Sequence, residues 1–175
     1  MATSYVILTV ANATLPSANA ATLVKTTSTG TPPTNAGTLT YNTLNFAQDA
    51  TDVRAMWEVP LPPDYLSTPT VTIIWGHTAT SGNAVLLAGC APATIGTTDE
   101  DAASYFAADT SGAVAVPATA GVDKSTTISL TDRGSGGTLA AGQVISVFVG
   151  RDADAAGDTA SGTLKVRGAY LAYTS

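Results

Sequence analysis

Residues 53–60 read VRAMWEVP, and this stretch alternates apolar side chains with charged or bulkier ones. The odd-numbered positions are apolar and comprise Val53, Ala55, Trp57 and Val59. Successive side chains of a β-strand point to opposite faces, so this period of two predicts a half-buried strand with Trp57 facing inward. Prolines at positions 60, 62 and 63 are expected to end it.

The same period continues from residue 39 to the end of the sequence. It predicts strands over residues 39–46, 71–75, 83–90, 126–130, 143–151 and 162–173, and a short edge strand at 114–116. A change of phase near Gly168 predicts a β-bulge, and one or two helical turns are expected within residues 97–108. About eight or nine strands separated by turns indicate an all-β, antiparallel two-sheet β-sandwich that is jelly-roll-like.

The first 38 residues differ in character from the rest. A strand is predicted at residues 5–10, and residues 11–38 are rich in Ala, Thr, Ser, Asn, Gly and Pro. Two interpretations stay open: an N-terminal arm (1–38) that lies on a neighbouring subunit, or an edge hairpin with a long loop. The sandwich domain is then 39–175. The beginning lacks a basic region and no run reaches about 20 apolar residues, so we expect a soluble protein made in the cytosol.

Charge is scarce. Charged residues make up 11% of the chain, against about 25% in typical soluble domains, and the net charge is −6. The 7 Lys and Arg residues are scattered, which disfavours binding to nucleic acid or to an anionic membrane. A surface of Thr, Ser, Asn and Gly suits a protein covered by neighbours, because few charges need desolvation. Cys90 is the only cysteine and is expected to be buried, without disulfide, zinc or cofactor.

Several local patterns occur in an order that is informative as a set. They are Leu44-Asn-Phe46, the strand 53–59 leading into Leu61-Pro-Pro-Asp-Tyr65, the Trp-bearing strand 71–75, the Ser-Gly turn at 81–85, the Arg-Asp-Ala-rich segment 149–159, and the last strand 164–173. This order resembles jelly-roll virion surface proteins of tailed bacteriophages and related prokaryotic viruses. The resemblance covers residues 44–173. It implies a structural capsid decoration, head-fibre or tail-associated protein that forms a homotrimer on the capsid exterior or on a fibre.

The implied partners are further copies of the chain and the major capsid protein or another virion protein, and the implied location is the virion. Two other functions stay open. One is a receptor- or carbohydrate-binding module of a tail fibre, which predicts an exposed aromatic cluster. The other is a single-jelly-roll capsid protein that closes a shell alone. A hydrolase is not expected, because nothing in the sequence places an acid and a base around one cleft.

The Asp-rich segment after the strand at 143–151 is the best candidate for a metal site. Asp152, Asp154 and Asp158 offer oxygen ligands of the kind that Ca²⁺ prefers, with Gly157 allowing a sharp turn. The spacing does not match an EF-hand loop. A solvated turn in which these side chains cap backbone N–H groups, with Arg151 paired to one of them, is the favoured interpretation.

The remaining candidates are weaker, and no catalytic residue is predicted. Carboxylates at positions 49, 52, 64 and 99–101 are interpreted as turn and cap residues. His77 is the only histidine and has no Gly-x-Ser-x-Gly partner motif. Trp57 and Trp75 are expected to pack in the core. Four tyrosines are expected to be better placed for exposed contacts: Tyr65, Tyr105, Tyr170 and Tyr173.

Overall fold

The computed structural model describes residues 2–27, 40–48, 51–93, 107–131 and 137–175, and these form ten strands and one short 3-10 helix. The elements are β1 (Thr3–Leu8), η1 (Val10–Asn12), β2 (Thr22–Thr27), β3 (Thr40–Phe46), β4 (Val53–Pro60), β5 (Ser67–His77), β6 (Asn83–Ala93), β7 (Asp109–Ala115), β8 (Lys124–Ser129), β9 (Val144–Arg151) and β10 (Leu164–Thr174). Within these residues no helix is long and apolar enough to cross a membrane.

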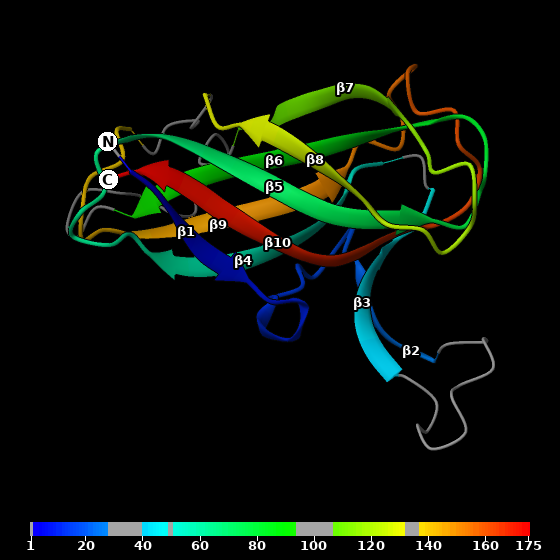
Figure 1. Ribbon diagram of the computed structural model, residues 1–175, viewed down its shortest axis with the longest axis horizontal. Coiled ribbons are helices and arrows are strands. Elements are labelled where there is room, and N and C mark those ends of the chain that lie inside the picture. Colours follow the sequence, from blue (N-terminus) through cyan, green and yellow to red (C-terminus); the bar gives the residue numbers. More distant parts are fainter. Residues whose placement is uncertain (1, 28–39, 49–50, 94–106, 132–136) are drawn as a thin grey trace.

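The strands form two antiparallel sheets that lie as front and back layers in Figure 1. Sheet A has six strands, with β3, β10, β5 and β8 in that order, β2 beyond β3, and β1 beside β10. Sheet B has the order β4-β9-β6-β7. From β3 onward the chain alternates between the sheets except at β6–β7. This is the eight-stranded jelly roll, and the predicted two-sheet sandwich is confirmed.

The core lies between the sheets and is built from the apolar phase of each strand. Burial in β4 alternates residue by residue, with Trp57 inward as predicted, and Trp75 of β5 is fully buried. Strand β9 lies between β4 and β6 and buries its last five residues, which explains why both of its faces are apolar. The register of β10 against β5 shifts between Val166 and Gly168, where the bulge was predicted.

The N-terminal residues add two strands to the eight of the jelly roll, which makes ten in place of the expected eight or nine. Strand β1 pairs with the C-terminal half of β10, while β2 pairs with β3, and the far ends of β2 and β3 project from the body (Figure 1). Between these strands, the backbones of Thr14, Asn19 and Ala21 bond to Met56 and Arg54 of β4. Contact of this region with a neighbouring subunit stays a prediction.

Other expectations concern local structure. The edge strand expected at 114–116 is the longer β7, which lies at the edge of sheet B. The helical turns expected at 97–108 fall almost entirely outside the described residues.

Candidate functional site

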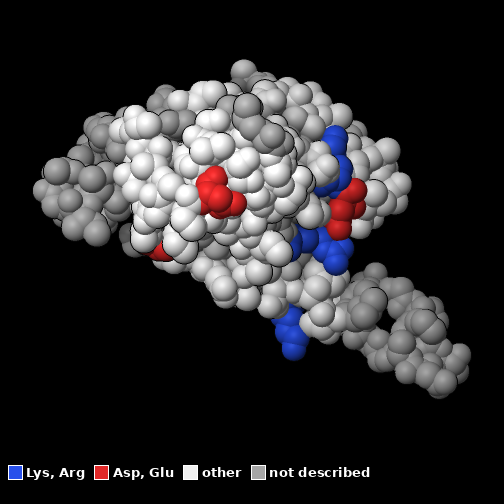
Figure 2. Space-filling model, turned by 60° about the vertical axis from the view of Figure 1, so that its left-hand side comes forward, with Lys and Arg blue, Asp and Glu red and all other residues white. Residues whose placement is uncertain are grey.

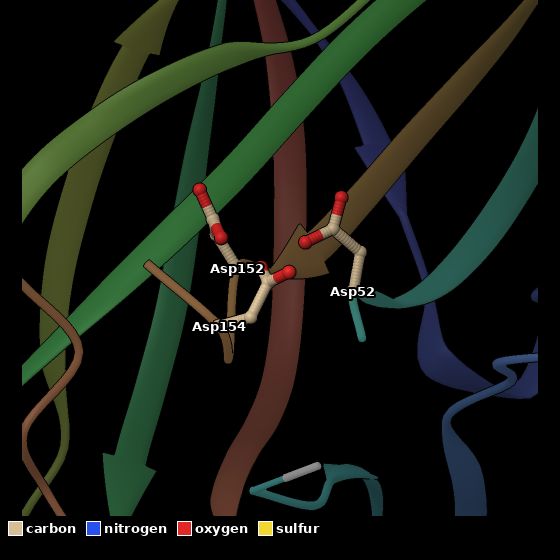
Figure 3. Close-up of side chains that lie close together, drawn as sticks. All are labelled: Asp52, Asp152 and Asp154. Carbon is tan, nitrogen blue, oxygen red and sulfur yellow. The ribbon is translucent and has the colours of Figure 1, made fainter. Parts of the chain in front are cut away.

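Three carboxylates meet at one end of sheet B. Asp52 immediately precedes β4, and Asp152 and Asp154 follow β9. Because β4 and β9 are antiparallel neighbours with Val53 opposite Arg151, the start of one strand lies beside the end of the other. One carboxylate oxygen from each of the three residues lies within 4.8 Å of the other two, and Figure 3 shows the Asp52 and Asp154 carboxylates turned toward each other with Asp152 beside them. Carboxylate oxygens in this arrangement can bind a hard cation or share a proton.

The three carboxylates line an open depression of about 620 Å³. Its other walls come from the N-terminal segment, from the start of β4 and from β9: Pro16, Ala18, Asn19, Thr51, Arg54, Met56 and Phe148. Arg54 donates a hydrogen bond from Nη2 to Asp52 Oδ2 at 2.9 Å, and its guanidinium lies 5.1 Å from the centre of the Phe148 ring. The depression therefore combines acceptor oxygens, one cation and some apolar surface.

Asp152 is the perturbed member of the cluster. Partial burial, followed by a hydrogen bond to Asp154 and repulsion from Asp52 and Asp154, raises the pKa of Asp152 from 3.8 to about 6. A backbone hydrogen bond at Ala155 opposes this rise. The hydrogen bond to Asp154 therefore favours the protonated form of Asp152.

Asp158, the third residue of the weak calcium candidate, does not join this cluster. It forms a fully buried ion pair with Arg151, with Nη2 to Oδ1 at 2.6 Å and Nε to Oδ2 at 2.9 Å. Asp158 also accepts the N–H of Val85, while Arg151 donates to the carbonyls of Ala160 and Gly162. The expected pairing of Arg151 with one of the aspartates is confirmed, and the acidic cluster has Asp52 in place of Asp158.

The sequence alone placed no two carboxylates around one cleft, and the structure brings Asp52, Asp152 and Asp154 together in one depression. Asp64 is elsewhere and accepts a hydrogen bond from the Tyr173 hydroxyl at 3.2 Å. The carboxylates at 49 and 99–101 lie outside the described residues. His77 is buried, its Nδ1 accepts the N–H of Ala79, and burial followed by the charge of Arg151 lowers its pKa.

Two of the tyrosines expected at the surface are buried, which corrects that prediction. Tyr65 and Tyr173 are 6% and 5% exposed because their rings pack together, with centres 5.7 Å apart. Tyr170 instead meets Tyr5, which the sequence did not single out, in an edge-to-face pair with centres 5.4 Å apart. Tyr5 and Ile7 are 60% and 76% exposed, and the three side chains line a shallow apolar depression of about 270 Å³. Tyr105 falls outside the described residues.

This apolar group belongs to a wider uncharged surface, the outer face of sheet A. The registers align Tyr5, Ala172, Thr70 and Ser129 in one row, and Ile7, Tyr170, Thr72 and Thr127 in the next. Ile74, which is 38% exposed, continues the face beyond the second row. The hydroxyls of Thr72 and Thr127 bond to each other at 2.7 Å. In the view of Figure 2, basic and acidic side chains gather at the right-hand side, and the rest of the visible surface carries only separate acidic patches.

Comparison with known proteins adds little beyond the fold. No family model matches the chain, and no curated protein matches it. A solved structure described as CBM35 from Cellvibrio japonicus Abf62 is 14% identical, with 96% of this chain and 92% of that chain covered and a TM-score of 0.49. A second, TmCBM61 in complex with β-1,4-galactotriose, is 12% identical, with 97% and 86% covered and a TM-score of 0.35. Both likenesses are too distant to carry a conclusion about this chain.

Proposed function

We propose that this chain is a non-catalytic structural protein of a virion surface, which binds neighbouring protein subunits through the outer face of sheet A. The observation that carries the proposal is the absence of charged side chains from the rows that join β1, β10, β5 and β8. The resemblance of residues 44–173 to phage virion proteins supports the particle as the setting, and it implies three copies per assembly.

The physical case rests on desolvation. Covering a charged side chain costs free energy unless a partner charge compensates it, whereas Thr, Ser and Tyr side chains can exchange water for hydrogen bonds across an interface. A neutral face also allows a chain of net charge −6 to approach other acidic subunits without like charges meeting at the contact. The face thus suits a protein that is held against others for long periods.

Co-assembly tests this proposal. The chain would be produced together with the major capsid protein of the same virus, and the assembled particles would be sedimented. We expect the wild-type chain to sediment with the particles and Ile74→Lys, which places a charge on this face beyond its second row, to be lost from them. Val122→Lys is the matched control, because Val122 is 50% exposed in the β7–β8 connection. Equal sedimentation of both variants, or none of the wild type, would contradict the proposal.

A module that binds carbohydrate is the second candidate. The Tyr5–Tyr170 pair provides the exposed aromatic surface that such a module requires, and the depression at Asp52, Asp152 and Asp154 offers acceptors for sugar hydroxyls. The two surfaces lie on different sheets, so variants can separate them.

A glycan array with the purified chain tests this second candidate. Sugar binding that Tyr5→Ala abolishes would assign it to the outer face of sheet A, and binding that Asp154→Asn abolishes would assign it to the depression. If the array gives no signal and the chain sediments with the particles, the structural role is the one of the two functions that remains supported.

A further inference from the structure

Among the described residues, every edge strand of the two sheets except β1 has a feature that hinders pairing with another chain. The free edge of β4 is covered by Thr14 and residues 19–21. Strand β7 contains Gly112 at a φ of 66° and a register shift against β6, and β2 and β8 each carry a lysine, Lys25 and Lys124. Glycine kinks, bulges and lysines are devices that stop a sheet from pairing with another chain. Strand β1 has none of them and reads TSYVIL.

The hydrogen-bond pattern shows which backbone groups of β1 face outward. Ala2 and Ser175 exchange both of their backbone hydrogen bonds, at 3.1 and 3.0 Å. In an antiparallel ladder such pairs alternate, so Ser4, Val6 and Leu8 bond to β10 while Thr3, Tyr5 and Ile7 direct their N–H and C=O groups away from it. The residues with outward backbone groups also carry the exposed side chains Tyr5 and Ile7.

We infer that the outer edge of β1 pairs with β1 of a second copy of this chain. An antiparallel pair centred on Tyr5 is self-complementary: Tyr5 of one copy bonds to Tyr5 of the other, and Thr3 of each bonds to Ile7 of the other. A two-fold axis through the Tyr5 pair generates this arrangement. It joins the two copies of sheet A into one continuous sheet and gathers Tyr5, Ile7 and Tyr170 of both copies into one apolar cluster.

Charge and area both favour a second copy as the occupant. No charged residue lies on β1, so two acidic chains meet there without repulsion at the contact. The exposed parts of Tyr5 and Ile7 in both copies, with the facing strand edges, amount to on the order of 1,000 Å², taking about 150–250 Å² for each aromatic side chain. This is close to but below the ~1,200–2,000 Å² of stable complexes, so we expect a reversible dimer with a dissociation constant on the order of 0.1 mM.

This pairing depends on neither proposed function, and it gives an even number of copies in contrast to the homotrimer that the resemblance implies. Sedimentation equilibrium of the full chain, over concentrations that bracket the expected dissociation constant, measures the number of copies. We expect the average mass to rise from that of one chain to that of two. A mass that stays at one chain, or that rises to three, would overturn the inference.

Hydrogen exchange of the backbone amides tests the contact itself. The amides of Tyr5 and Ile7 are expected to exchange rapidly in dilute solution and slowly in the dimer, while those of Val6 and Leu8 are protected in both. If the Tyr5 and Ile7 amides are already protected at concentrations where the mass is that of one chain, another segment of the same chain occupies the edge and the inference fails.

Ile7→Pro is the most specific variant, because it removes an outward N–H and breaks no hydrogen bond to β10. It should weaken the dimer by at least about tenfold, since two intermolecular hydrogen bonds are lost by symmetry. Tyr5→Lys keeps every backbone group and should also weaken the dimer by at least about tenfold. This second variant tests the pairing even if Ile7→Pro impairs folding. Ile74→Lys, on the same face but away from the edge, is the control and should leave the dimer unchanged. A dimer that survives both edge variants would refute the pairing.

Discussion

Arg151 and Asp158 show how one buried ion pair organises a whole loop. Both side chains are 0% exposed, and between them they bond to each other twice, to the N–H of Val85 and to the carbonyls of Ala160 and Gly162. Buried charges persist only when their partners and remaining hydrogen bonds are supplied, and this pair meets that condition. The connection between β9 and β10, which carries Asp152 and Asp154, is thereby tied to β6 and to its own far end.

Removal of one partner of this pair should be severe. Arg151→Met leaves Asp158 charged and buried, and we expect the free energy of unfolding to fall by about 3–5 kcal/mol. Asp123→Asn, which breaks the partly exposed pair with Arg167, should cost less than about 1 kcal/mol. Urea denaturation of both variants measures the difference. A double variant, Arg151→Met with Asp158→Leu, should recover part of the lost free energy. If Arg151→Met alone costs no more than Asp123→Asn, the buried pair is not needed for stability.

Asp152 predicts a dependence of stability on pH. Its pKa in the folded chain is about 6, above its ordinary value of 3.8, so folding favours the protonated form. The stabilising contribution is complete below pH 3.8 and is lost as the pH rises through about 6.

Asp152→Asn puts a neutral side chain at this position, so the stability that is lost when Asp152 ionises should be retained. We expect it to raise the free energy of unfolding at pH 7 by about 1 kcal/mol, a figure reduced for the solvent exposure of the group, and to have no such benefit near pH 4. Thermal unfolding over this pH range checks the expectation, with Glu58→Gln on the exposed side of β4 as the control. An equal effect of Asp152→Asn at both pH values would contradict the assignment of the raised pKa.

At the scale of strands, substitution by alanine is expected to have very different effects on stability at two glycines, one in sheet A and one in sheet B. A Cβ at Gly89 of β6 would overlap the Ala107 carbonyl oxygen and the Phe148 ring, whereas one at Gly168 of β10 would have no atom within 4 Å. Gly89→Ala should therefore cost about 1–3 kcal/mol, and Gly168→Ala should change the free energy of unfolding by no more than about 0.5 kcal/mol. Chemical denaturation measures both. Similar costs at the two positions would show that the close packing over β6 is not as described.

The strands themselves could be predicted from the sequence, because the alternation in residues 53–60 and the phase change at Gly168 are local properties of the chain. The pairing of β4 with β9 could not, since it joins residues almost a hundred positions apart through the packing of the whole sandwich. The site depends on that pairing: Asp52 meets Asp152 and Asp154 only because β4 begins where β9 ends. The same limit explains Tyr65 and Tyr173, whose burial follows from a tertiary contact.

In the molecule as a whole, the first strand is expected to unfold together with the jelly roll. Leu8 is 1% exposed and Val10 is 8% exposed in the core, and the Thr9 carbonyl accepts the indole N–H of Trp57 at 2.8 Å. The N-terminal residues therefore contribute to the same core as the jelly roll.

Leu8→Ala tests this unity. It should lower the free energy of unfolding of the whole domain by about 2–5 kcal/mol, the range for a buried leucine, while its exposed neighbour Ile7→Ala should change it little in dilute solution. Circular dichroism and tryptophan fluorescence should follow one shared transition. Two separate transitions, with only the smaller one moved by Leu8→Ala, would mean that the N-terminal strand unfolds on its own.

The hydrogen bond between Trp57 and Thr9 gives the protein a natural optical reporter. The chain has 2 tryptophans, and the other, Trp75, donates its indole N–H to the Thr126 hydroxyl of β8. In a Trp75→Phe background, all indole emission comes from a ring whose polar atom is bonded to the residue just after the first strand. Detachment of that strand would admit water to the ring and shift its light to longer wavelengths, so the motion could be followed in real time without any added dye.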